Sequence, residues 1–82
     1  MLPDGTIVEM KIWRLAVPGS AHRLKYSLFY GLPGTRMVSY DNERGKGDHR
    51  HVDDREEPYV FVTAEKLMAD FLADVRRLRG DL

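Results

Sequence analysis

The sequence contains no cysteine and no apolar run long enough to cross a bilayer. The first absence excludes a disulfide framework and any thiolate metal site. The second absence, together with an N-terminus that lacks a basic stretch followed by an apolar one, argues against membrane insertion and secretion, so we expect a cytoplasmic protein. Thirteen basic residues balance thirteen acidic ones, and the chain therefore also lacks the strong positive field of a dedicated nucleic-acid binder.

The length of the chain limits how large a core it can form. Its 82 residues, of which 43% are hydrophobic and 32% charged, are too few for two cores, and we predict a single domain over residues 1–82. A core of this size supplies only on the order of 3–5 kcal/mol. We therefore expect a chain that is bound to a partner or associates with itself, with a homodimer as the expected oligomer.

The first half of the sequence has the alternation of apolar and polar residues that is typical of β-strands. Three segments show it: residues 6–17, 22–30 and 36–40. Clusters of Pro and Gly between them predict short turns and antiparallel neighbours. Pro58 is expected to open a fourth strand over residues 59–62, because the first residue of a strand need not donate a hydrogen bond to the sheet.

The C-terminal part of the sequence predicts one amphipathic helix. Its apolar residues recur at spacings of three and four: Leu67, Phe71, Val75 and Leu78. Thr63 is suited to cap the first turn and Gly80 to end the helix. The predicted fold class is therefore α+β, a four-stranded antiparallel meander with one C-terminal helix packed on one face. The opposite face, carrying some of Trp13, Tyr26, Phe29 and Tyr40, would need a second subunit or a partner to cover it.

Residues 41–57 are almost wholly polar or charged, and we predict that they form a mostly exposed loop. A long insertion between two strands of a small domain is uncommon unless it is functional. Three groups able to transfer protons or bind a metal lie within four positions: Asp48, His49 and His51. The positively charged residues suited to bind an anion are Arg44, Lys46, Arg50 and Arg55. This segment is therefore the predicted functional site.

The histidines of this segment have the chemistry that phosphodiester cleavage requires. Such cleavage needs a base, an acid and a fixed cation, and histidine, with an ordinary pKa of about 6.5, can take either proton-transfer role. If His49 and His51 lie in extended backbone, the period of two places both imidazoles on one face. We expect no cofactor, with a divalent metal at Asp48, His49 and His51 as the alternative. Further candidate ligands are His22, Asp53 and Asp54.

Simpler interpretations of the same residues remain open. A segment rich in Asp, Arg and His is often a solvated surface with shifting ion pairs. The run RGKG at residues 44–47 allows a close backbone approach to a phosphate, but it lacks the spacing and the following helix of a phosphate-binding loop. His22 is more typical of a core or interface histidine than of a catalyst.

Three stretches of the sequence resemble a known family. YSLFYG, then RMVSYDNERGKGDHRH, then EEPYVFVTAEKLMADFLADV are similar to the TumE-type toxins of bacterial toxin–antitoxin modules, from about His22 to the C-terminal helix. The resemblance implies a cytoplasmic growth-inhibiting protein. It also implies a cognate antitoxin, commonly one with a DNA-binding helix-turn-helix domain.

Ribonuclease activity is a hypothesis that rests on the residue types of the loop. In this hypothesis His49 and His51 share the acid and base roles, and Asp48 is a third catalytic residue. The residues expected to contact RNA or its phosphates are Arg44, Lys46, Arg50 and Asp41, and Asp41 or Asp48 is also suited to orient a histidine. The alternative function is a non-catalytic module that binds another protein through its sheet face or edge. A role as the neutralising partner is disfavoured, because the chain lacks a disordered acidic tail and a recognisable helix-turn-helix.

Overall fold

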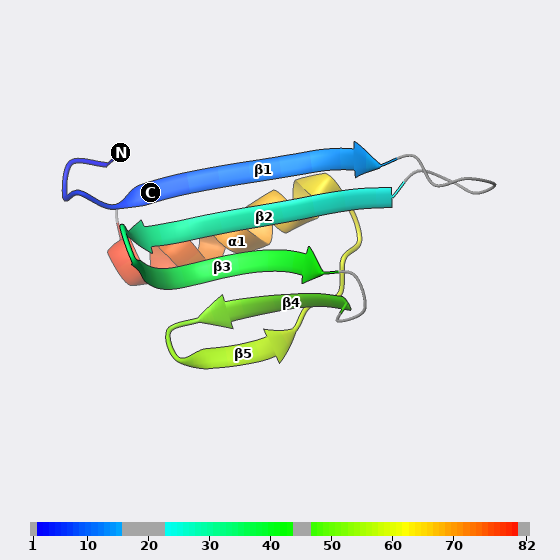
Figure 1. Cartoon of the computed structure of the whole chain (residues 1–82). Helices are drawn as coiled ribbons and strands as arrows, with labels where there is room; N and C mark the ends of the chain where they lie inside the picture. Colours follow the sequence, from blue (N-terminus) through cyan, green and yellow to red (C-terminus); the bar gives the residue numbers. More distant parts are fainter. Residues whose placement is uncertain (1, 16–22, 44–46, 81–82) are drawn as a thin grey trace.

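The computed structural model describes residues 2–15, 23–43 and 47–80. The elements in these ranges are, in chain order, β1 (Ile7–Leu15), β2 (Arg23–Leu32), β3 (Thr35–Glu43), β4 (Gly47–Val52), β5 (Arg55–Pro58) and α1 (Ala64–Arg79). The strands form one sheet in sequence order, and each neighbouring pair is antiparallel. Figure 1 shows this meander with α1 lying across one side, behind β2 and β3. The predicted α+β class is confirmed, with five strands in place of four.

The second half of the sheet differs from the prediction. The expected loop over residues 41–57 is wrong, because β3 runs on to Glu43 and a hairpin of β4 and β5 occupies most of the rest. The strand expected over residues 59–62 is also wrong, since this segment has no regular secondary structure and connects β5 to α1. Strands β4 and β5 are held by backbone pairing and have no apolar stripe. One face of their hairpin lies away from α1, and on the other face polar groups pair with one another.

The core lies between the sheet and α1. Its fully buried members are Tyr26, Leu28, Tyr30, Val38, Tyr40, Leu67, Phe71 and Val75. Tyr26 and Tyr40 therefore belong to the helix side, contrary to one option left by the sequence. Trp13 and Phe29 alternate with the inward residues of their strands and lie on the other face, which we call the open face.

Local geometry fixes both ends of α1 and one close approach between β2 and β3. The Thr63 hydroxyl accepts a hydrogen bond from the backbone N–H of Lys66 (3.0 Å), and Gly80 takes a left-handed conformation (φ 83°), so both predicted ends of α1 are confirmed. Where the register of β2 and β3 shifts, a Cβ at Gly31 would lie only 2.2 Å from the carbonyl oxygen of Thr35. Glycine is therefore required there for the backbones to approach.

Asp70 links α1 to the segment that precedes it, and this contact should make stability depend on pH. Its carboxylate accepts from the Tyr59 hydroxyl (2.7 Å) and pairs with Lys66 (2.9 Å), which together hold the pKa of Asp70 below its usual value. A carboxyl with a lowered folded-state pKa stabilises the fold above its unfolded pKa, and this stability is lost as the pH falls through the folded value.

We therefore expect Asp70→Asn to lower the free energy of unfolding at pH 7, with a deficit that shrinks below about pH 4. Urea unfolding at pH 7 and pH 3 measures the difference in the free energy of unfolding between this variant and the wild type. Asp54→Asn, at an exposed turn position, is the control and should follow the wild type at both pH values. An equal deficit of Asp70→Asn at the two pH values would contradict the assignment.

Candidate functional site

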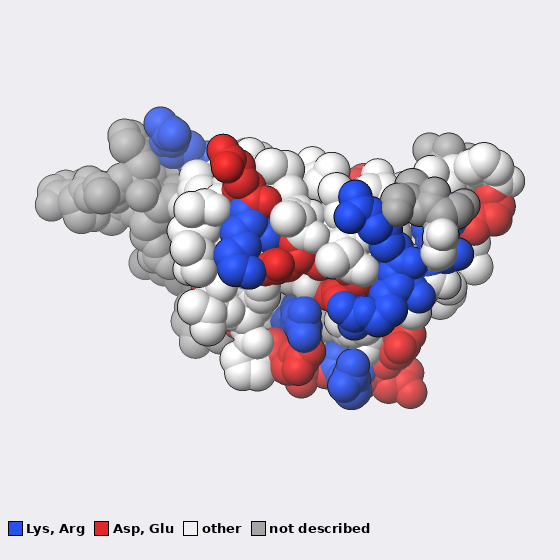
Figure 2. Space-filling view, turned by 180° about the vertical axis from the view of Figure 1, so that it is seen from behind, with Lys and Arg blue, Asp and Glu red and all other residues white. Residues whose placement is uncertain are grey.

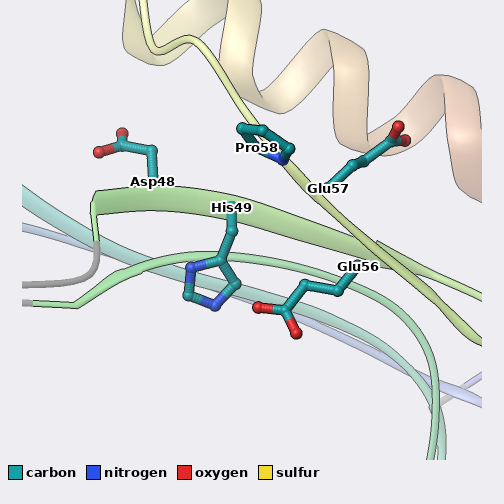
Figure 3. Close-up of a pocket in the computed structure, with 5 residues that line it drawn as sticks. All are labelled: Asp48, His49, Glu56, Glu57 and Pro58. Atoms are coloured by element: carbon teal, nitrogen blue, oxygen red, sulfur yellow. The ribbon is translucent and has the colours of Figure 1, made fainter.

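The two histidines of β4 lie side by side on the open face. The register pairs His49 with Asp41 and His51 with Ser39 across β3, so alternate residues of β4 face away from α1. Asp48 and the other intervening residue of β4 face the helix. Figure 3 shows this division, with His49 and Glu56 on one side of the hairpin and Asp48 and Glu57 on the side of the helix.

The imidazoles are close to each other and to carboxylates. Their ring centroids are 5.4 Å apart, with the ring planes inclined by 76°. The Nε2 of His49 lies 2.6 Å from Oδ1 of Asp41, and the Nε2 of His51 lies 3.9 Å from Oε2 of Glu56. The side chains of His49 and His51 are only 13% and 15% exposed, so neighbouring groups restrict their orientation.

Glu56 is a member of this site that the sequence reasoning missed. Donor atoms of His49, His51 and Glu56 all lie within 4.8 Å of one another. Glu56 comes from β5, directly opposite His51. The signal that points to it is the pair Asp53 and Asp54 between two strands, since Asp tolerates the positive φ that such a turn needs, and Asp53 has φ 56°.

Ser39 completes the surroundings of His51. It is the cross-strand partner of His51 on the open face, yet it is 7% exposed. Its hydroxyl oxygen is buried without a hydrogen-bond partner within residues 2–15, 23–43 and 47–80. A buried hydroxyl in this condition is available to a ligand or to an ordered water.

An open hollow of about 500 Å³ lies at the β4–β5 edge of the sheet. Its lining residues are Asp48, His49, Glu56, Glu57 and Pro58, and Figure 3 shows them. Because these side chains come from both faces of the β4–β5 hairpin, the hollow is lined from both sides of this sheet edge. His49 and Glu56 are the lining residues that also belong to the histidine cluster, so the hollow gives a ligand access to one side of that cluster.

The structure does not bring Asp48 to the histidines. Its carboxylate accepts a hydrogen bond from the Tyr26 hydroxyl (2.6 Å) on the helix side. Burial, and then this bond to Asp48, raises the pKa of Tyr26 above its ordinary value. A metal shared by Asp48, His49 and His51 would need ligands from both faces of one strand, so Glu56 takes the place that the sequence suggested for Asp48.

Arg50 also points to the helix side. Its guanidinium donates to Glu57 (2.7 Å), to the Tyr40 hydroxyl (3.1 Å) and to Asp74 (3.3 Å). Asp74 is 1% exposed and also accepts a hydrogen bond from Tyr40. Burial, and then the bond to Asp74, raises the pKa of Tyr40. Arg50 is thus held among polar groups, two of them buried, on the face opposite His49.

Several predicted residues fall elsewhere. Arg44, Lys46 and His22 lie outside the described residues, and in sequence Arg44 and Lys46 fall between Glu43 and Gly47, which are paired ends of β3 and β4. Asp53 and Asp54 are exposed at the turn between β4 and β5.

The rest of the open face offers groups that suit RNA. Trp13 is 44% exposed on β1 and pairs in register with Lys25, which is exposed on β2. Lys11 occupies the row that continues through Ser27 and Asp41 to His49. An exposed indole can stack on a base, and lysines can contact phosphates.

The basic end of α1 is a separate surface. Figure 2, seen from the helix side, shows Lys and Arg spread across this face among acidic side chains, with their largest group toward the right end. Arg76, Arg77 and Arg79 lie in the last turn of α1. Arg77 pairs with Asp74 (2.9 Å) and Arg79 with Asp4 (2.7 Å), so part of this charge is compensated locally.

Fold and site together define a small α+β protein in which His49, His51 and Glu56 cluster on the sheet face that α1 leaves open. A model of a family described as toxin TumE matches residues 2–79, nearly the whole chain, and the protein belongs to this toxin family. The resemblance noted in the sequence is thereby confirmed, and with it a toxin role. Comparison with curated proteins and with solved structures gave no match. Helix α1, the helix of the described residues, lacks the length and apolarity needed to span a membrane.

Proposed function

We propose that this protein is the toxin of a bacterial toxin–antitoxin module and that it cleaves RNA with His49 and His51 as its base and acid. One observation supports this most directly: the two imidazoles share a face, with ring centroids 5.4 Å apart and Asp41 only 2.6 Å from His49. A nucleophilic reaction needs a base that a third group orients, and we assign this role to Asp41, whose carboxylate lies beside His49. The toxin family supplies the context.

The proposed reaction transfers two protons. His49 removes the proton of a ribose 2′-hydroxyl, and the freed oxygen attacks the adjacent phosphorus. The bond from phosphorus to the 5′-oxygen breaks, and His51 donates its proton to that leaving oxygen. The products are one strand ending in a 2′,3′-cyclic phosphate and one beginning with a 5′-hydroxyl. His49 ends the step with the 2′-hydroxyl proton and His51 ends it neutral, so the number of protons is conserved.

The substrate is proposed to lie along the open face. Neighbouring strands are about 4.8 Å apart, so Trp13 on β1 is roughly 14 Å from β4, which a few nucleotides can span. Trp13 would stack on a base, and Lys11 and Lys25 would contact phosphates. Arg44 and Lys46 are proposed to contact the phosphate at the cleavage site, as their place in the sequence beside β4 suggests.

A cognate antitoxin with a DNA-binding domain is the proposed partner, and it would neutralise the toxin by covering the open face. The second candidate function, a non-catalytic module, is favoured by a different observation. Val60 and Val62 are 79% and 59% exposed in the segment that follows the edge strand β5, where a protein partner would bury them. Binding there would leave the histidines without a role.

RNA cleavage by the purified protein tests the proposal. We expect single-stranded RNA oligonucleotides to be cut in EDTA, with cyclic phosphate and 5′-hydroxyl ends identified by mass spectrometry. The same oligonucleotides with 2′-deoxyribose should stay intact, because they lack the attacking hydroxyl. Intact RNA, together with tight binding of the product of the neighbouring open reading frame, would favour the interaction module.

A further inference from the structure

We propose that His49, His51 and Glu56 also form a binding site for one divalent transition-metal ion of the zinc class. These three residues supply two imidazole nitrogens and one carboxylate oxygen, the number of protein ligands that an open zinc site uses. The ligands come from adjacent strands of one short hairpin, β4 and β5, so no distant segment has to move for them to meet.

The distances suit closure around an ion. Donor atoms of the three residues lie within 4.8 Å of one another, whereas ligands around tetrahedral zinc are roughly 3.3 Å apart, given bonds of about 2.0–2.2 Å. Part of the remaining contraction can come from Glu56, whose side chain is 61% exposed. The histidines are already packed against their neighbours, and this lowers the entropy that binding would otherwise cost.

Asp41 and Ser39 provide the surroundings that metal-binding histidines usually have. A ligating histidine commonly donates its second ring N–H to a carboxylate, which fixes the tautomer. Oδ1 of Asp41 is buried, lies 2.6 Å from Nε2 of His49 and has no hydrogen-bond partner within the described ranges, so Asp41 is the carboxylate beside this ligand. The buried Ser39 hydroxyl, unpartnered within the described ranges and opposite His51, is placed to bind a water on the ion or the second nitrogen of His51.

The types of donor select the class of metal. Calcium and magnesium prefer sites made wholly of oxygen ligands, whereas imidazole suits zinc, copper and nickel. With no cysteine in the chain, a thiolate site for copper(I) or an iron–sulfur cluster is excluded. Zinc is the ion we assign, and cobalt(II) is its spectroscopic substitute.

Metal binding should inhibit RNA cleavage, a consequence that rests on the proposed function. A bound ion occupies the imidazole lone pairs that the base and acid roles require. The toxin would then be active when the site is empty and inactive when it is filled. Binding itself does not depend on the catalytic proposal and is measured without RNA.

Titration of the untagged, EDTA-treated full chain with zinc chloride in a calorimeter tests the site. We expect one ion per chain, binding weakened more than tenfold in His51→Ala and in Glu56→Gln, and about 10–100-fold in Asp41→Asn. Glu65→Gln, which removes an exposed acid in the first turn of α1, is the charge-matched control and should bind as the wild type does. Cobalt(II) should give the strong visible absorption of a tetrahedral site.

The outcomes separate the two proposals. If the ion does not bind, or binds equally well to the His51→Ala and Glu56→Gln proteins, the metal site is wrong whatever the RNA assay gives. If one ion binds as expected and the metal-free protein leaves RNA intact, the site is supported and the catalytic proposal fails. Should the metal-free protein cut RNA, one equivalent of zinc is expected to slow cutting at least tenfold, and undiminished cutting by zinc-loaded protein would overturn the inhibition.

Discussion

Replacement of His51 by alanine is expected to abolish RNA cleavage and growth arrest while the protein stays folded. General acid catalysis contributes about 10²–10⁴-fold to a rate, so the loss should be at least a hundredfold. The fold should survive because His51 lies on the open face and outside the core cluster. Initial rates on an RNA oligonucleotide, together with growth after induced expression, measure the effect.

The controls separate loss of chemistry from loss of structure. His49→Ala should be as inactive as His51→Ala, because base and acid are both required. Asp41→Asn should retain part of the activity, since it only orients His49. Asp54→Asn, in the turn of the same hairpin, should cleave at the wild-type rate. A His51→Ala protein with wild-type thermal unfolding that still cuts RNA and arrests growth would remove His51 from the mechanism.

The helix and the first three strands are predictable because their apolar residues repeat with the period of the element they form. Leu67, Phe71 and Val75 mark the buried stripe of α1, and Thr63 and Gly80 mark its ends by local hydrogen bonding and backbone geometry. In these elements local sequence and tertiary packing favour the same structure. The sequence alone is therefore sufficient to predict these elements.

The hairpin of β4 and β5 could not be recognised in this way. Asp48 and Arg50 face the core side, but each is polar because its partners, Tyr26 and Asp74, are polar groups contributed by distant parts of the chain. No alternation of apolar and polar residues results. Conversely, Tyr59 and Phe61 alternate with exposed valines and imitate a strand, although they pack against the core without joining the sheet.

Contacts with other parts of the chain also limit what the sequence can say about the site. The period of two correctly places His49 and His51 on one face, but it also sends Arg50 to the other face once the segment is a strand. Glu56 becomes a neighbour of His51 only through the turn at Asp53, which fixes the register of the hairpin. Residue types therefore indicate the chemistry, whereas the strand register decides which residues share it.

Arg50→Met should destabilise the protein by about 2 kcal/mol. The guanidinium bonds Glu57, Tyr40 and Asp74, and its removal leaves the carboxylate of Asp74, 1% exposed, with less compensating charge. Removing one partner of a fully buried pair costs about 3–5 kcal/mol. The expected cost is smaller here because the Arg50 side chain is 30% exposed and Arg77 still pairs with Asp74.

Thermal unfolding should show a fall in Tm of roughly 8–16 °C for Arg50→Met, given about 4–8 °C per kcal/mol in a domain of this size. Arg55→Met, which replaces an exposed arginine on the adjacent strand β5, is the matched control and should stay within about 0.5 kcal/mol of the wild type. An unchanged Tm for Arg50→Met would show that its contacts on the helix side do not stabilise the fold.

The same variant tests the phosphate-binding role that the sequence assigns to Arg50. At a temperature well below its Tm the variant is folded, so its stability no longer affects RNA binding. If Arg50 acts only between sheet and helix, the affinity for RNA and its dependence on salt should match the wild type there. Loss of a phosphate contact would instead weaken binding and reduce the slope of log K against log salt by about one unit. The two positions open to this guanidinium, against Asp74 or against RNA, therefore give separable results.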